Sequence, residues 1–221
     1  MLLEQTTGDT TLLIRQFEVG NFSIFSYLVG DEQSGEALFI DPSDSPEMLL
    51  KEAASLKLTI KYIVNTHHHI DHVMGNREMV RRTGAKIVIH EADAPWLGHT
   101  DPEMIELFGA VQSPPADIRV SDGQLIRVGD VALKVLHTPG HTPGGMCLYT
   151  DGMVFTGDTL FVGSTGRTDF PGGSYAELER SIRTKLYTLP GNTVILPGHN
   201  YGITPTSTIE QERRTNAVIR A

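Results

Sequence analysis

The segment 66–72, Thr-His-His-His-Ile-Asp-His, carries the densest group of side chains in this chain that could do chemistry. It follows an apolar run that predicts a buried strand, so it should lie in a loop. His67 and His69 are two residues apart, so in an extended segment both side chains point the same way and His68 points the other way. Imidazole and carboxylate groups suit zinc, iron or manganese. We therefore predict a metal-binding loop that uses His67, His69, Asp71 and His72.

Three more candidate ligands each follow a short apolar run farther along the chain: His141, Asp158 and His199. A strand end is a rigid platform for a loop residue, which a preorganised metal site needs. All seven donors together exceed what one tetrahedral ion needs, and none is a thiolate. We therefore predict two divalent ions sharing a bridging carboxylate, with zinc as the expected metal and iron or manganese as alternatives. Such a site lowers the pKa of bound water toward ~7, so that a hydroxide can attack an acyl carbon.

The other histidines and the single cysteine suit structural roles. His90 and His99 are expected to be surface or packed polar residues, and His137 to support the Gly- and Pro-rich turn that follows it. Cys147 lies in an apolar run, which predicts a packed core thiol. With one cysteine, an intrachain disulfide is impossible.

The apolar pattern predicts two sheets with helices outside them. In the first half, strands are expected at 22–28, 37–40, 60–64 and 86–89, and helices from residue 46 and at 73–82. In the second half, strands are expected at 124–128, 131–136, 146–149, 153–156 and 193–196, and helices at 176–186 and 209–219. Strands followed by helix in each half suit two packed sheets. The segment 92–116 is irregular, and the pattern assigns it no role.

Length and charge narrow the classes of function. The chain has 221 residues without an internal repeat or linker, so we expect a single domain over 1–221. Its formal net charge of −9 argues against a broad nucleic-acid-binding surface, which requires clustered Lys and Arg. It has neither an apolar run of the ~20 residues that span a membrane nor the pattern of a secretion signal. We expect a cytoplasmic protein without nucleic-acid or membrane partners, and the sequence makes no prediction of its oligomeric state.

In type, spacing and order, the seven candidate ligands resemble the motifs of the metallo-β-lactamase superfamily. The resemblance spans most of the chain. It implies an αββα sandwich, an α/β (α+β) fold of two packed mixed sheets flanked by helices, with the metals at one sheet edge. It also implies one metal held by His67, His69 and His141, and another held by Asp71, His72 and His199. Asp158 would bridge the two and Asp71 would steer the attacking water, so these are the expected catalytic residues.

Two branches of that superfamily resemble this chain. The runs 155–161 and 166–170 look like those of glyoxalase II, which hydrolyses glutathione thioesters such as lactoylglutathione. Because the chain ends soon after His199, it resembles the compact bacterial form without a long C-terminal helical domain. The runs 166–170 and 198–201 are also similar to persulfide dioxygenases, which oxidise glutathione persulfide with a single iron, here on His67, His141 and Asp158. We predict the hydrolase, with the dioxygenase as the alternative.

Both branches point to Arg167 and Tyr201 as contacts for a glutathione-like small molecule. Arg offers a fork for a carboxylate, and Tyr offers an amphipathic wall. The alternative for Arg167 is a pair with Asp169 that shapes the loop. Tyr175 is a further pocket candidate, with packing at a helix start as its alternative.

Other functions are weaker or remain alternatives. Lactone hydrolysis stays open because it needs the same hydroxide. The acidic balance disfavours a nuclease, and the missing signal disfavours a secreted β-lactamase. A metal-stabilised binding module is the non-enzyme alternative, but ligands on open loops favour an exchangeable site.

Overall fold

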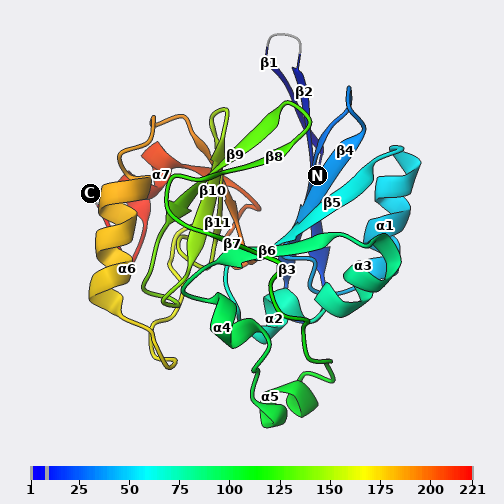
Figure 1. The fold of residues 1–221 in the computed structure, drawn as a ribbon. Coiled ribbons are helices and arrows are strands. Elements are labelled where there is room, and N and C mark those ends of the chain that lie inside the picture. Colours follow the sequence, from blue (N-terminus) through cyan, green and yellow to red (C-terminus); the bar gives the residue numbers. More distant parts are fainter. Residues whose placement is uncertain (1, 8–9, 221) are drawn as a thin grey trace.

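Two β-sheets packed face to face, with helices on their outer sides, make up the fold in the computed structural model, which describes residues 2–7 and 10–220 (Figure 1). Within these residues, the first sheet has seven strands in chain order: β1 (Leu2–Thr7), β2 (Thr10–Val19), β3 (Ile24–Asp31), β4 (Glu36–Ile40), β5 (Thr59–Val64), β6 (Lys86–His90) and β7 (Ile118–Val120). Strands β1 to β4 pair antiparallel, and β4 to β7 pair parallel. The predicted αββα sandwich is confirmed.

The second sheet comes from the other half of the chain. Among the described residues it has six strands in the order β13-β12-β11-β10-β9-β8: β8 (Leu125–Val128), β9 (Val131–His137), β10 (Met146–Thr150), β11 (Met153–Gly157), β12 (Val194–Pro197) and β13 (Ser207–Thr208). Its strands pair antiparallel except for the parallel pair β11 and β12. Both sheets are therefore mixed.

The helices connect and cover these strands (Figure 1). In chain order they are α1 (Pro46–Ser55), α2 (Ile70–Val73), α3 (Asn76–Thr83), α4 (Ala94–Leu97), α5 (Pro102–Leu107), α6 (Tyr175–Ser181), its π-helical continuation η1 (Ile182–Leu186) and α7 (Ile209–Thr215). Helices α1 and α3 cover the outer face of the first sheet, and α6 and α7 cover that of the second.

Apolar side chains fill three layers, one between the sheets and one under each group of helices. In β4, Leu38 and Ile40 face the second sheet, whereas Ala37 and Phe39 face the helices. A sheet buried on both faces needs a continuous apolar run, which is what this strand has. Each fully buried large side chain contributes roughly 1.5–3 kcal/mol to folding. The single domain expected over 1–221 stays a prediction, which the shared layer between the sheets supports.

Three predicted elements differ from the structure by more than one residue at an end. The helix expected at 73–82 corresponds to α3, and Val73 is instead the last residue of α2; Gly75 between the two packs so closely on the carbonyl oxygens of Pro42 and Ser43 that a side chain there would collide. The helix expected at 209–219 ends at Thr215, where the Asn216 side chain accepts from the next backbone N–H groups instead. The strand expected at 22–28 is displaced to Ile24–Asp31 by a turn before it.

The carboxyl ends of several strands meet at one edge of the sandwich. Strands β4, β5 and β6 are parallel neighbours in the first sheet. In the second, β9 and β11 both run antiparallel to β10, and β12 runs parallel to β11, so these three also end together. Backbone bonds join the two sheets here, from Met146 N to Thr66 O (3.0 Å) and from Phe25 N to Gly198 O (2.8 Å). This edge therefore brings the loops of both halves together.

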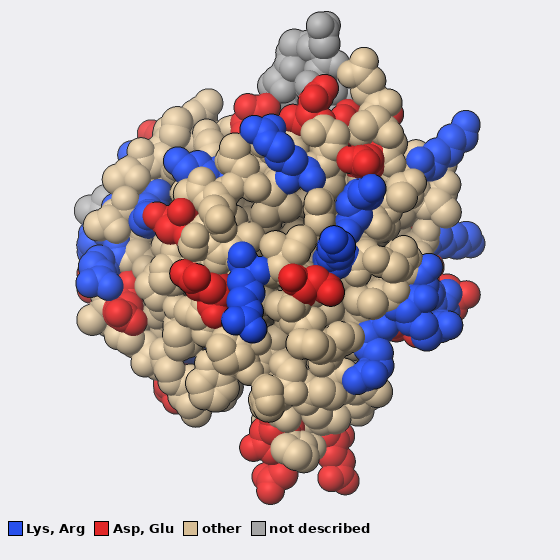
Figure 2. All heavy atoms as spheres, viewed as in Figure 1, with Lys and Arg blue, Asp and Glu red and all other residues tan. Residues whose placement is uncertain are grey.

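The surface charge gives no sign of a nucleic-acid site on the face drawn in Figure 2. Basic and acidic side chains are interspersed there, and the projecting end that holds α5 is acidic. Within the described part of the chain, no helix has the length and apolar character needed to cross a membrane.

Candidate metal centre

All seven side chains named from the sequence lie together at the shared edge. Segment 65–69 after β5 carries His67 and His69, and the short helix α2 carries Asp71 and His72. The turn between β9 and β10 carries His141, and Asp158 and His199 follow β11 and β12. Among the described residues, their ligand atoms form three groups, each with all atoms within 4.8 Å of one another: His67 with His69 and His141; His67 with His72 and Asp158; Asp71 with His72 and His199.

Two triads can be distinguished in this cluster. In the first triad (His67, His69, His141), His69 Nδ1 and His141 Nε2 are 2.9 Å apart. In the second triad (Asp71, His72, His199), His72 Nε2 and His199 Nε2 are 3.2 Å apart, and Asp71 Oδ2 is 3.5 Å from His199 Nε2. Nitrogen atoms this close repel each other unless a proton or a cation lies between them.

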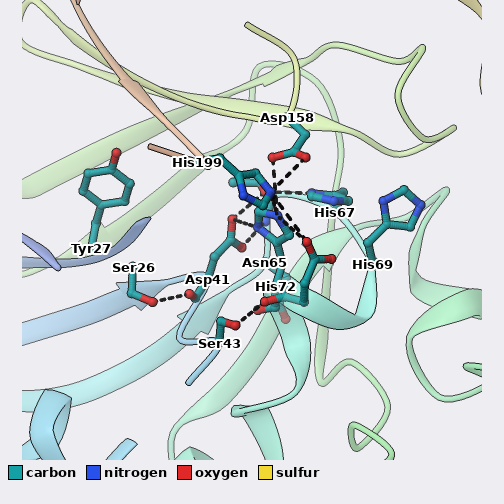
Figure 3. A network of polar contacts seen from close by, with 12 residues as sticks. Ser26, Tyr27, Asp41, Ser43, Asn65, His67, His69, His72, Asp158 and His199 are labelled. Atoms are coloured by element: carbon teal, nitrogen blue, oxygen red, sulfur yellow. Dashed lines mark hydrogen bonds and ion pairs between the residues drawn. The ribbon is translucent and has the colours of Figure 1, made fainter. Parts of the chain in front are cut away.

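Asp158 contacts both triads, and Figure 3 shows it beside His72 and His199 of the second triad. Its Oδ2 is 3.6 Å from His141 Nε2 and 3.3 Å from His199 Nε2, and its Oδ1 is 3.3 Å from His72 Nε2. A carboxylate in this position could bind a metal ion held by either triad.

The outward-facing nitrogens of four histidines have partners that orient the rings. Nδ1 of His141 donates to Arg167 O (2.7 Å), and Nδ1 of His199 donates to Phe22 O (2.9 Å). Nδ1 of His72 lies 3.0 Å from an oxygen of the Asp41 carboxylate, and Nδ1 of His67 lies 3.1 Å from Thr66 Oγ1. Such partners fix the orientation of each ring, so each Nε2 points to the centre of the cluster.

Asp41 is a supporting residue of the site that the sequence pattern does not predict. It follows β4, is buried, and accepts from Thr66 N (2.8 Å), Thr66 Oγ1 (2.6 Å) and His72 Nδ1 (3.0 Å). It therefore supports His72 directly and His67 through Thr66 (Figure 3). Only its place at the end of a buried strand, ahead of Pro42, could have indicated a role, because one aspartate before a proline is also an ordinary turn.

Charge and burial act differently on the two triads. Burial lowers the pKa of His67 well below its usual value and lowers that of His69 to about 3. Burial also acts to lower the pKa of His72, but the carboxylates of Asp158, Asp71 and Asp41 raise it well above its usual value. Burial opposes ionisation of Asp158 too, yet His72 and His199 hold its pKa well below the usual range.

The cluster fits one or more cations. Within the described residues, His67 Nε2 and Asp158 Oδ1 are buried without a hydrogen-bond partner, which is costly unless a ligand completes them. A Cβ on Gly198 would collide with Asp158 Oδ1 and press on His72, so a glycine is needed to keep this space. Donors of nitrogen and carboxylate type, without sulfur, suit zinc, iron or manganese.

The histidines expected to be structural lie outside the three groups. His68 faces away from them, with Nδ1 2.9 Å from the carboxylate of Asp93. His137 donates from Nε2 to Pro143 O (2.9 Å) and stacks on the buried ring of His90 with centroids 3.9 Å apart. His99 is bonded to Pro95 O at 2.8 Å, on the outside of the protein.

Aromatic side chains border the cluster where it opens to solvent. Phe170 sets its edge against His69 (5.3 Å between centroids), and the Arg167 guanidinium lies 4.0 Å over the Phe170 ring. Tyr201, 58% exposed, stacks on His199 with centroids 4.4 Å apart. Of the three predicted substrate contacts, Arg167 and Tyr201 thus lie at the site.

The structure also shows the alternative expected for Arg167, a two-bond pair with Asp169 at 2.5 and 2.6 Å. Tyr175 is the first residue of α6, and its side chain is exposed. The structure gives it no contact with either triad.

A histidine- and carboxylate-rich centre at the edge of an αββα sandwich defines a class of metal-dependent proteins, and comparison with known proteins agrees. The model of the metallo-beta-lactamase superfamily matches residues 19–199. The chain belongs to this superfamily.

Relatives from two branches are similar to it. The mitochondrial persulfide dioxygenase ETHE1 of Mus musculus is 35% identical over 221 residues, covering 97% of this chain and 79% of the relative. The hydroxyacylglutathione hydrolase GloC of Haemophilus influenzae is 34% identical over 202 residues, covering 88% of this chain and 92% of the relative. Among solved structures, TTHA1623 in a di-iron-bound form superposes with a TM-score of 0.80 at 32% identity, covering 92% of this chain and 98% of that one.

Proposed function

We propose that this protein is a binuclear metallohydrolase that cleaves the thioester of a glutathione conjugate. The first triad would hold one ion, the second triad the other, and Asp158 would bridge them. The observation that carries this proposal is that Asp158 contacts His141 on one side and His72 and His199 on the other. A site for one ion would not need both triads converging on one carboxylate.

When bound, two such ions would supply a water of lowered pKa and would polarise the thioester carbonyl. The attack adds the water oxygen to the acyl carbon, the C–S bond breaks, and the products are a carboxylic acid and a thiol. The thiolate that leaves takes up a proton.

Asp71 is suited to orient the attacking water. Its side chain is 21% exposed, whereas those of His72 and His199 are almost fully buried, so it is the second-triad residue that solvent reaches. A carboxylate accepts a hydrogen bond from water and can take its proton.

The glutathione part of the substrate would lie along the aromatic border. Tyr201 offers a flat ring beside the second triad, and Phe170 offers another beside the first. Arg167 would take a carboxylate in exchange for Asp169, because a guanidinium forms the same two-bond fork with either. The hydrolase relative named above acts on hydroxyacylglutathione, which fits this arrangement.

A second candidate is oxidation of glutathione persulfide with a single iron. It is favoured by the 35% identity to a persulfide dioxygenase over almost the whole chain. In that case His67, His141 and Asp158 would hold the iron, and the second triad would hold none.

Metal content and two assays on one preparation separate these candidates. The hydrolase predicts about two ions per chain, measured by plasma mass spectrometry, and loss of lactoylglutathione absorbance. The dioxygenase predicts about one iron and oxygen uptake with glutathione persulfide.

The variant Asp71→Ala separates the hydrolase from the dioxygenase because Asp71 belongs to the second triad alone. It should remove hydrolysis and one ion, while an exposed-site control, Asp101→Ala, should change neither. If Asp71→Ala keeps full activity and the wild-type metal content, the binuclear hydrolase is wrong.

A further inference from the structure

A second buried aspartate, Asp93, lies beside the metal centre without belonging to either triad. Its side chain is fully buried after β6. Its carboxylate accepts from His68 N (3.1 Å), from Thr142 Oγ1 (2.8 Å) and from Gly144 N (2.5 Å). The same carboxylate pairs with His68 Nδ1 at 2.9 Å. A buried carboxylate with this many donors is fixed in position.

These donors come from the two loops that carry the first triad. His68 lies between His67 and His69, and Thr142 directly follows His141. The two loops belong to different sheets, so their spacing depends on contacts between the sheets. Asp93 therefore links the backbone on each side of the pair His69 and His141, whose ring nitrogens are 2.9 Å apart.

The close approach of these loops depends on a glycine. A Cβ on Gly144 would collide with the backbone nitrogen and the carboxylate of Asp93. The turn can bring its N–H to the carboxylate only because no side chain is present there. Loop 138–145 is thus shaped to receive this aspartate.

Asp93 and Asp41 flank the ligand loop from both sides. The loop follows β5, whose parallel neighbours are β4 and β6; Asp41 directly follows β4, and Asp93 lies three residues after β6. Asp41 contacts His72 and Thr66, whereas Asp93 contacts His68 and Thr142. Each side of the loop is therefore tied by one carboxylate.

Trp96 completes the contact on the Asp93 side. It lies on α4 and stacks on His68, with ring centroids 5.7 Å apart and planes at 22°. Because the ring covers His68, it limits the rotation that would break the bond to Asp93. The sequence pattern assigns no role to the segment 92–116. Two residues near its start, Asp93 and Trp96, contact His68 in the metal-binding loop.

We infer that Asp93 is a positioning residue that sets the spacing between the His67–His69 loop and His141, and through it the affinity of the first triad for its ion. The inference rests on the proposed metal centre but is independent of the substrate and of the reaction. It predicts a local effect: loss of Asp93 weakens the first triad and leaves the second nearly unchanged. A merely structural role would weaken both or neither.

The test is a titration of metal-free protein with Co²⁺ alone. Binding is monitored by visible absorption and by the fluorescence of Trp96, the only tryptophan in the sequence. Asp93→Asn is made in two backgrounds: Asp71→Ala, which retains the first triad, and His69→Ala, which retains the second. Partners that orient metal ligands typically change affinity by about 10- to 100-fold. We expect a loss of that size in the first background and a change below about threefold in the second.

A matched control is Asp101→Asn, an aspartate of the same segment whose carboxylate caps α5 by accepting from Glu103 N (2.9 Å). It should leave Co²⁺ affinity unchanged in both backgrounds. Equal Co²⁺ dissociation constants with and without Asp93→Asn, or equal losses in both backgrounds, would overturn the inference.

If circular dichroism shows that Asp93→Asn does not fold, Thr142→Val is the test variant. It removes the hydrogen bond from Thr142 Oγ1 to Asp93 and keeps the shape of the side chain. We expect a loss of several-fold in the first background only, and an unchanged affinity there would overturn the inference. Since no substrate is used, failure of lactoylglutathione hydrolysis would count against the proposed function and not against this role of Asp93.

Discussion

The two triads use similar side chains, but the protein surrounds them with different charge. The first triad is made of imidazoles alone, and burial keeps the pKa of His67 and His69 low. The second contains Asp71, and the carboxylates around His72 raise the pKa of that imidazole against the effect of its burial. The lowered pKa values of His67 and His69 leave their lone pairs available to an ion near neutral pH, whereas the raised pKa of His72 favours a proton that an incoming ion must displace.

This difference shows that similar ligands can differ in how strongly protons compete with a metal ion for them. Metal binding competes with protons for the same nitrogen atoms, so a triad with low imidazole pKa values binds with less dependence on pH. Relatives named as hydrolase and as dioxygenase are both similar to this chain. We propose that filling of the second triad separates the two reactions.

The largest effect is expected for Asp158→Ala, because Asp158 contacts both triads. Losing an essential group typically lowers turnover on the order of 10³-fold or more. We expect that loss in steady-state hydrolysis, with reduced metal content and an unchanged circular dichroism spectrum. His141→Ala should act on the first triad alone. If Asp158→Ala turns over substrate like the wild type, the site assignment is wrong.

A smaller effect is expected from pH on the second ion. The raised pKa of His72 means that binding at the second triad releases a proton, so its apparent affinity should rise about tenfold per pH unit below that pKa. The lowered pKa values of His67 and His69 keep both imidazoles neutral, so these two ligands should add little pH dependence to the affinity of the first triad between about pH 6 and 8.

Zn²⁺ calorimetry across this pH range measures both steps. As the pH falls, the second ion should be lost first, and the heat of its binding should depend on the buffer because a proton is released. If the first triad loses its ion before the second triad as the pH falls, the proposed difference in proton competition between the triads is wrong.

Arg167→Ala should have a modest effect, on substrate binding alone. The guanidinium is exposed and already paired with Asp169, and exposed pairs of this kind contribute little. We expect the KM for a glutathione thioester to rise about 2- to 5-fold with kcat unchanged. Arg180→Ala, which breaks the exposed pair with Glu177 on α6, is the matched control. An unchanged KM would remove Arg167 from the substrate pocket.

The smallest effect on the site is expected for Cys147→Ala. Burial raises the pKa of the thiol to about 11, so at pH 8 only about one molecule in a thousand carries the thiolate. A disulfide reagent should therefore label the denatured protein but not the native one. The variant should lose roughly 1–2 kcal/mol of stability and keep both metal ions. Rapid labelling of the native protein would contradict the buried thiol.

The strands and helices that the sequence predicts are mostly those with strong apolar patterns, such as β4, β5 and α1. Strand β2 is missing from the prediction because Arg15, Gln16 and Glu18 interrupt its apolar run. Backbone pairing with β3 along most of its length stabilises this strand in the fold. The short strand β7 and the helices of segment 92–116 have too few residues for a periodic pattern to appear.

The candidate ligands could be found in the sequence because several rare side chains occur at close spacing after apolar runs. Asp41 and Asp93 could not, since each is a single aspartate in a loop, and aspartates are common in loops. Their roles appear only when β4, β5 and β6 are placed side by side.

By itself, the sequence determined the chemistry that is available: the donors, their order, and a fold of two packed sheets with helices outside. The tertiary structure alone decided which donors share a triad, that Asp158 contacts both, and in which direction the pKa values of His67, His69 and His72 shift. The physical reason is that residue type and local spacing are written along the chain, whereas distances, burial and pKa values depend on strands that are far apart in sequence and are brought together at one edge.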